Sequence, residues 1–258
     1  MCKELEYIPA TLKVVEYVSV HYGCPKCKTD DEKPNIIHAP VPAALLRSYA
    51  SPSIVAWVIY SKYVNGMPLY HQEKDWLQYG FELSRATMAN WVIECTDKYL
   101  RVLYEFYHRL LLSRGFAMAD ESRIQVLKEE GREATAKSYM WLFRSGEDDT
   151  PPIVLYKYAS THSGDVAKEF LKGFNGYLMA DGYTGYNKVQ DIKRCCCFAY
   201  IRRYFFDAIP KRKNRDISCP AVQGVEYCDK LFAYERHFKE KGYSYKQIKM
   251  VVSRKKNR

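Results

Sequence analysis

The sequence predicts a mixed α/β domain preceded by a small helical module. Apolar residues recur at helical spacing from Ser51 to about Leu112, which indicates several amphipathic helices. After Gly115 the spacing changes, and short apolar segments alternate with turn residues and with short helical segments. The helical module is therefore expected first along the chain, with the α/β domain behind it.

The first helix is expected to begin at Ser51 and Pro52. Serine is a favourable N-cap, and proline suits the first helical position because that position needs no backbone donor. The apolar residues that repeat at helical spacing, and so are expected to face the core, are Ile54, Val55, Val58, Ile59 and Tyr63. An amphipathic helix here would form one wall of a small bundle.

The next two helices have the outline of a helix-turn-helix. One runs from about Pro68 to Gln78, Gly80 ends it, and Ser84 caps the other. This outline occurs in DNA-binding modules and also in small helical bundles, so both interpretations stay open. The inward residues of the third helix are expected to be Met88, Trp91 and Val92, and the exposed candidates for DNA contact are Arg85, Thr87 and Asn90. A long amphipathic helix from about 96 to 113 follows.

The α/β part begins with consecutive strands and continues with alternating helix and strand. Strands are expected at 116–120, 123–127, 138–143, 153–158, 177–180 and 194–199, and helices at 165–173, around Tyr186, at 200–209 and at 227–241. This order indicates antiparallel strands first and parallel additions later. It fits a ribonuclease-H-like domain, and it also fits other α/β folds.

The composition is that of an ordinary globular protein. Of the 258 residues 47% are hydrophobic and 27% are charged, and no apolar run is long enough to predict a membrane span. The N-terminus lacks the pattern of a signal peptide, so a cytoplasmic location is expected. Nine cysteines, three of them adjacent at Cys195, Cys196 and Cys197, favour thiols or metal ligands over disulfides.

The charge of +10 is concentrated in the last quarter of the chain. From Lys188 to Arg258 there are 19 Lys and Arg against 7 Asp and Glu, whereas residues 1–187 carry 21 against 23. A basic region of this kind indicates a polyanionic partner, with nucleic acid favoured over a membrane surface. The alternative is a solvated basic surface, which is the favoured interpretation for the last five residues.

Two aspartates are each expected at the end of an apolar strand. Asp120 ends Met118-Ala119-Asp120, and Asp181 ends Leu178-Met179-Ala180-Asp181. Carboxylates at the ends of neighbouring strands can share a site for Mg²⁺ or Mn²⁺, which prefer oxygen ligands. Gly182 is expected to allow a sharp turn there and to leave room for a phosphate. The alternative is that both aspartates cap turns.

Several segments resemble, in order, those of bacterial transposases of the insertion sequence 66 family, which belong to the DDE class. Asp120-Glu121-Ser122 is similar to the family's Asp-Glu-Thr. The other similar segments are Lys62-Tyr63, Pro68-Leu69-Tyr70, Ser84 to Trp91, Ser138 to Trp141, Gly173 to Leu178 and Asp181 to Tyr186. The chain is identified as a member of this family, with its resemblance strongest in the centre and with the expectation that it is truncated at both ends.

The resemblance implies a ribonuclease-H-like core in which Asp120 and Asp181 are the first two catalytic acids. They would bind Mg²⁺ or Mn²⁺ and activate water, then a 3′-hydroxyl, for cleavage and joining of DNA. DNA, namely element ends and target, and a homo-oligomer on that DNA are the partners implied. Asp207, Glu226 and Glu235 are available by residue type as a third acid. The resemblance instead places Glu235 in an inserted helical region, and the third acid beyond Arg258.

The family's Cys-Trp-Ala-His-Ala-Arg-Arg-Lys-Phe signature is similar to Cys197-Phe198-Ala199-Tyr200-Ile201-Arg202-Arg203-Tyr204-Phe205. Arginine suits phosphate because its planar fork can donate two parallel hydrogen bonds, so Arg202 and Arg203 are the expected DNA-backbone contacts. Tyr200 stands where the family has histidine. This difference is expected to remove a group that hydrogen-bonds or carries a proton near the site.

Cys24 and Cys27 have the spacing of half a zinc site. The family carries a second pair upstream, whereas only Cys2 precedes this one here, with His21 and His38 as possible replacements. Reduced thiols without Zn²⁺ are the favoured interpretation, and a bound Zn²⁺ is the alternative.

Four segments are therefore expected. They are a remnant of a zinc-finger-like segment at 1–42, a helical DNA-binding or linker module at 43–114, a ribonuclease-H-like transposase core at 115–210, and a basic, partly helical inserted region at 211–258. The expected function is metal-dependent DNA cleavage and strand transfer at the ends of an insertion sequence. The alternative function is that of a catalytically silent remnant that binds DNA.

Overall fold

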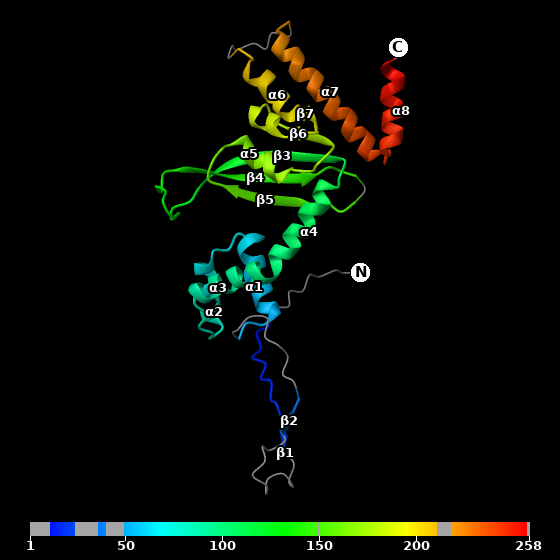
Figure 1. Cartoon of the computed structure of the whole chain (residues 1–258). Helices are drawn as coiled ribbons and strands as arrows, with labels where there is room; N and C mark the ends of the chain where they lie inside the picture. Colours follow the sequence, from blue (N-terminus) through cyan, green and yellow to red (C-terminus); the bar gives the residue numbers. More distant parts are fainter. Residues whose placement is uncertain (1–10, 24–35, 40–48, 149, 211–217, 257–258) are drawn as a thin grey trace, which may run out of the picture. The chain divides into compact units, whose positions relative to one another are not determined.

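The computed structural model describes residues 11–23, 36–39, 49–148, 150–210 and 218–256 (Figure 1). The chain divides into two compact units, residues 1–100 and 101–258. Within the described residues no helix combines the length and the apolar character that crossing a membrane would need.

The first unit contains three short helices and a small hairpin. α1 (Pro52–Tyr63) begins after Ser51, whose side chain accepts a hydrogen bond from the backbone N–H of Ile54 at 3.3 Å. α2 spans Leu69–Gln78, and α3 (Arg85–Cys95) begins after Ser84, which accepts from the N–H of Thr87 at 3.1 Å. Both predicted serine caps are confirmed. β1 (His21–Gly23) and β2 (Ile36–His38) pair antiparallel.

The core of the first unit lies between these helices. Val55 and Val58 of α1 and Met88 and Trp91 of α3 are buried, as the helical spacing predicts. Tyr63 was expected to face inward, but it is 64% exposed because it lies in the last turn of α1, past the end of the packed interface. α3 continues into a π-helical turn, η1 (Thr96–Leu100), so the long helix predicted from 96 is not uniformly α-helical.

The second unit is built on a five-stranded mixed sheet. After α4 (Arg101–Leu112), its strands are β3 (Phe116–Gln125), β4 (Lys137–Ser145), β5 (Val154–Ala159), β6 (Tyr177–Ala180) and β7 (Lys193–Cys196). The order across the sheet is β5-β4-β3-β6-β7 (Figure 1). β3, β4 and β5 pair antiparallel, and β6 and β7 extend the sheet in parallel, as predicted.

One strand prediction is wrong. The segments 116–120 and 123–127 were expected as two strands, but β3 is continuous because it pairs with β4 without a break from Ala117 to Gln125. The polar residues in the centre of β3 interrupt the hydrophobic pattern, but the backbone hydrogen bonds to β4 continue past them.

The helices of the second unit follow the alternation that the sequence indicates. α5 (Gly164–Phe170) lies between β5 and β6, and the short η2 (Thr184–Lys188) lies between β6 and β7. α6 (Phe198–Asp207) follows β7, and α7 (Pro220–Glu240) begins seven residues before the predicted helix does. α8 (Tyr245–Lys256) was not predicted. Its sequence carries five Lys and Arg residues and no Asp or Glu.

One face of the sheet and α5 enclose the main core. Trp141 and Phe143 of β4 and Leu178 of β6 are fully buried there, and Phe143 stacks on Phe170 of α5 with ring centroids 3.9 Å apart. Alternate residues of a strand point to opposite faces. Ala117, Ala119 and Glu121 of β3 therefore point toward this core, and Asp120 points to the other face.

Candidate active site

Asp120 lies in the middle of β3 and not at a strand end as expected, whereas Asp181 directly follows β6, the parallel neighbour of β3. β3 and β6 pair with Phe116 opposite Tyr177 and Met118 opposite Met179. Continuing this register by two residues brings Asp120 level with Asp181, just past the end of β6. Neighbouring strands are about 4.8 Å apart, so the two residues are expected to lie near each other. The negative charges of both raise the pKa of Tyr200, which is consistent with a shared location.

Both oxygens of Asp120 accept hydrogen bonds. Oδ1 accepts from the backbone N–H of Glu121 at 2.9 Å, and Oδ2 accepts from the hydroxyl of Tyr200 in α6 at 2.9 Å. Burial, this hydrogen bond and the two carboxylates raise the pKa of Tyr200 to about 12, against the opposing charge of Arg203. Tyr200 is therefore a neutral donor at ordinary pH.

The position of Tyr200 corrects the expectation drawn from the family's histidine. The expected loss of a hydrogen-bonding group does not occur, because the tyrosine hydroxyl reaches the first aspartate directly. The guanidinium of Arg203 lies over the Tyr200 ring at 5.1 Å from its centroid. α6 therefore brings a hydrogen-bond donor to Asp120 and places a cation over the ring of the same tyrosine.

Asp181 is held at the start of a tight turn. Its Oδ1 accepts from the backbone N–H of Tyr183 at 2.9 Å. Nη2 of Arg194, on β7, donates to the carbonyl oxygens of Asp181 and Tyr183, each at 2.7 Å. Gly182 lies in a bend directly after Asp181, as expected, and it does so without a positive φ. A Cβ at Gly182 would lie 3.3 Å from the hydroxyl of Tyr204, so the glycine makes room for α6.

A second polar group lies behind Asp120, on the core side of β3. The side chain of Glu121 is only 7% exposed, and its two oxygens contact Nε2 of His162 at 2.7 Å and the hydroxyl of Tyr186. Burial and Glu121 raise the pKa of Tyr186. Sequence reasoning missed His162, Tyr186 and Arg194 as part of the site. Tyr186 belongs to the family-like segment after Asp181, which was the available signal, whereas nothing in the sequence marks His162.

The two predicted arginines have different surroundings. Arg202 is paired with Asp229 of α7 through Nε at 2.6 Å and Nη2 at 3.3 Å, so its fork is occupied by a carboxylate. This pair also holds the pKa of Asp229 below its ordinary value. Arg203 is exposed and lies on the Tyr200 side of α6. Of the two, Arg203 contacts the ring of Tyr200, whose hydroxyl donates to Asp120.

Arg85 and Asn90 lie on α3 of the first unit and are both exposed. The backbone N–H of Arg85 donates to Oε1 of Glu73 at 3.0 Å, and its guanidinium lies over the ring of Tyr70, 5.7 Å from the centroid. The sequence-predicted DNA contacts are thus divided between the two units.

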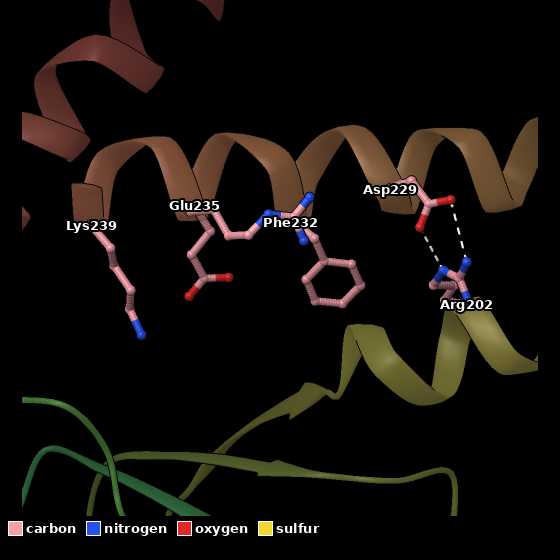
Figure 2. Close-up of a pocket in the computed structure, with 6 residues that line it drawn as sticks. Arg202, Asp229, Phe232, Glu235 and Lys239 are labelled. Atoms are coloured by element: carbon pink, nitrogen blue, oxygen red, sulfur yellow. Dashed lines mark hydrogen bonds and ion pairs between the residues drawn. The ribbon is translucent and has the colours of Figure 1, made fainter. Parts of the chain in front are cut away.

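The third-acid candidates are all exposed. Asp207 is the last residue of α6, and Glu226 and Glu235 lie on α7. Figure 2 shows Glu235 on the side of α7 that lines a pocket of about 490 Å³ with Arg202 and Asp229. Among the described residues, no three His, Cys, Asp or Glu side chains are grouped as metal ligands, so none of these candidates completes the site of Asp120 and Asp181.

The donor set of the two aspartates fits a hard divalent cation. Each carboxylate oxygen has two lone pairs, so an oxygen that accepts one hydrogen bond can still bind a cation. Mg²⁺ is commonly held by one or two carboxylates with water as the remaining ligands. Asp120 and Asp181 would be these two carboxylates. Cys24 and Cys27 lie outside the described residues, so the zinc site stays a prediction.

A known family matches most of the chain, including both aspartates. The fold and the carboxylate pair occur in a chain related to transposases, since residues 47–258 match the family model described as "Transposase IS66 family". The chain belongs to this family. It is a family of DDE transposases, which typically use divalent metal ions.

Three uncharacterized proteins of Sinorhizobium fredii are similar to the chain. The protein y4jD is 28% identical over 80% of this chain and 42% of its own length. The protein y4qI is 30% identical over 67% of this chain and 34% of its own length. The protein y4hP is 26% identical over 90% of this chain and 44% of its own length. The chain thus spans less than half the length of these relatives. No solved structure matches the chain.

Proposed function

We propose that the chain acts in the transposition of a bacterial insertion sequence, through metal-dependent cleavage and joining of DNA strands at Asp120 and Asp181. The observation that carries this proposal is the register of β3 and β6, which, continued by two residues, brings Asp120 within β3 level with Asp181 just past the end of β6. Both residues lie inside the family match. The proposed fold of the second unit is ribonuclease-H-like, which the sheet order β5-β4-β3-β6-β7 supports.

In this proposal Asp120 and Asp181 hold Mg²⁺ or Mn²⁺. A bound divalent ion of this kind stabilises the attacking and leaving oxygens of an in-line phosphoryl transfer. The hydroxyl of Tyr200 orients the Asp120 carboxylate, and Arg194 fixes the backbone of the Asp181 turn. Arg203 is placed to donate to a phosphate near the carboxylates, since its guanidinium extends over the Tyr200 ring.

DNA contacts are proposed for both units. The basic region from Lys188 onward would bind the DNA backbone, and α2 and α3 with Arg85 and Asn90 would act as a helix-turn-helix-like module. The segments 43–114, 115–210 and 211–258 would serve as DNA-binding module, catalytic core and basic inserted region. Because it would act on bacterial DNA, the protein would be located in the cytoplasm. It would bind DNA as a homo-oligomer that brings two element ends together.

A second candidate function is DNA binding without cleavage. It is favoured by one observation, namely that no third acidic, cysteine or histidine side chain joins the two aspartates among the described residues. The Arg202–Asp229 pair, which connects α6 with α7, is compatible with a binding role as well.

Nicking of supercoiled DNA separates the two candidates. The purified chain would be incubated with Mg²⁺ or Mn²⁺ beside Asp120→Asn, Asp181→Asn and the control Asp165→Asn, an exposed aspartate in the first turn of α5. Cleavage lost in the first two variants and kept in the control supports the proposed function. Cleavage that is equal in all four proteins contradicts it. Absent cleavage with DNA binding retained supports the second candidate.

A further inference from the structure

His162 lies in an aromatic stack on the core side of the sheet, between β5 and α5. Its ring stacks on Tyr139 with centroids 4.5 Å apart and 12° between the planes, and on Tyr183 at 4.2 Å and 15°. The hydroxyl of Tyr183 also donates to the backbone oxygen of His162 at 2.6 Å. Two stacked neighbours and this bond leave the imidazole little freedom to turn.

The edge of the same ring contacts a buried carboxylate. Nε2 of His162 lies 2.7 Å from Oε1 of Glu121, while the hydroxyl of Tyr186 donates to Oε2. A carboxylate that is 7% exposed is costly unless its oxygens are hydrogen-bonded, and these two contacts satisfy both oxygens. His162 is therefore one of two side chains that keep Glu121 in place.

These contacts connect the segments that carry the two aspartates. Glu121 directly follows Asp120 on β3, and its N–H binds the Asp120 carboxylate. Tyr183 comes two residues after Asp181, and its N–H binds the Asp181 carboxylate. His162 contacts Glu121 with its ring edge and Tyr183 with its ring face. A single side chain thus contacts the residue that holds each aspartate.

A direct role as a metal ligand does not fit His162. Its partner Glu121 points to the opposite face of β3 from Asp120, because successive residues of a strand alternate. No metal-binding group that contains His162 is found among the described residues. The arrangement fits a side chain that sets the separation of the two aspartate segments from behind the sheet.

We propose that His162 is a positioning residue for the carboxylate pair, which holds the centre of β3 at Glu121 and the Asp181–Tyr183 turn at one separation. The proposal rests on the proposed function, in which Asp120 and Asp181 bind a divalent cation together. A cation that is bound by two carboxylates requires a fixed separation between them. Loss of the His162 contacts would make this separation less well defined and so weaken cation binding. Loss of a residue that orients a metal ligand typically weakens metal affinity about 10- to 100-fold.

The test is Mn²⁺ binding to the full chain, measured from the electron paramagnetic resonance signal of free Mn²⁺. His162→Phe keeps a ring between the two tyrosines and removes the contact with Glu121. The matched control is His108→Phe. His108 also stacks on an aromatic ring, that of Phe170 at 4.2 Å, and contacts a backbone oxygen at 2.7 Å, but none of its contacts involves the aspartate segments.

We expect His162→Phe to weaken Mn²⁺ binding about tenfold, at the lower end of the range for such partners because it acts one residue further from the ligands. His108→Phe is expected to leave the affinity within about twofold, a change that would be small beside that range. Unchanged Mn²⁺ affinity in His162→Phe, or an equal loss in both variants, overturns the proposal.

Two further variants keep the outcomes distinct. Tyr183→Leu removes the ring that stacks on His162, and it is also expected to weaken Mn²⁺ binding. This variant tests the proposal if His162→Phe does not fold. Asp120→Asn reports on the proposed function itself. If it leaves Mn²⁺ binding intact, the proposed function and this inference both fail. If Asp120 is required and both stack variants bind normally, only the inference fails.

Discussion

The hydroxyl of Tyr200 donates a hydrogen bond of 2.9 Å to Oδ2 of Asp120, across 80 residues of sequence. Tyr200 lies in the first turn of α6, directly after β7, so the parallel end of the sheet delivers this donor to a carboxylate on the central strand. A tyrosine at this position can orient the carboxylate. It is too weak an acid to lose its proton near neutral pH.

Removing the carboxylate charge is expected to shift the titration of Tyr200. In the folded chain Asp120 and Asp181 help to raise the pKa of Tyr200 to about 12, and Asp120→Asn removes the nearer charge. The pKa of Tyr200 should then fall toward 10, the ordinary tyrosine value. The measurement is tyrosinate absorbance against pH, with Tyr200→Phe subtracted to isolate this residue. An unchanged pKa in Asp120→Asn would contradict the contact.

The same shift fixes the direction of a stability change. The folded pKa of Tyr200 lies above its unfolded value, so the stabilisation is complete below about pH 10 and is lost as pH rises through about 12. Wild type should therefore lose more free energy of unfolding than Tyr200→Phe between these two pH values. Denaturant unfolding at several pH values measures this, and parallel curves for the two proteins would refute it.

The adjacent arginines of α6 are expected to contribute unequally to DNA binding. Arg203→Gln should weaken binding and reduce the slope of log affinity against log salt by about 0.9, the value for one phosphate contact. Arg202→Gln should have a smaller effect, because Asp229 already occupies its guanidinium. Titration of a labelled duplex at several salt concentrations compares them. A larger effect at Arg202 would mean that the pair with Asp229 opens on DNA.

The buried face of β6, the strand that precedes Asp181, is expected to contribute strongly to the stability of the second unit. Leu178 of β6 is fully buried in the core under the sheet. Leu178→Ala should lower the free energy of unfolding by about 2–5 kcal/mol, the usual cost of a cavity in a packed core. Tyr177→Ala is the control, since Tyr177 lies on the other face of β6 and is 47% exposed. Equal effects of the two substitutions would show that this face of β6 is not the packed one.

The sequence predicts the parallel part of the sheet better than its centre. β6 has the predicted bounds, Tyr177–Ala180, because four apolar residues stand between a glycine and an aspartate. β3 was predicted in two pieces, since Asp120, Glu121 and Ser122 break the apolar pattern while the ladder to β4 continues. Backbone pairing that is set by a partner strand leaves no signal in the residues of the strand itself.

The candidate site was predictable as far as its two aspartates and no further. Both follow an apolar run in the sequence, but only Asp181 follows the end of its strand, since Asp120 lies within β3. Their level register is a property of β3 and β6 together. His162 and Glu121 are 41 residues apart, and Tyr200 and Asp120 are 80 apart. Contacts of this kind depend on the completed sheet, so neither residue type nor spacing reveals them.

The most direct test of the central claim is the position of Mn²⁺ in crystals of the chain, located by its anomalous scattering. The account predicts one peak bound by carboxylate oxygens of both Asp120 and Asp181, at the separation of about 2.0–2.4 Å usual for oxygen ligands of hard cations. A peak that is bound elsewhere, or no peak at the two aspartates with Mn²⁺ in excess, would contradict it.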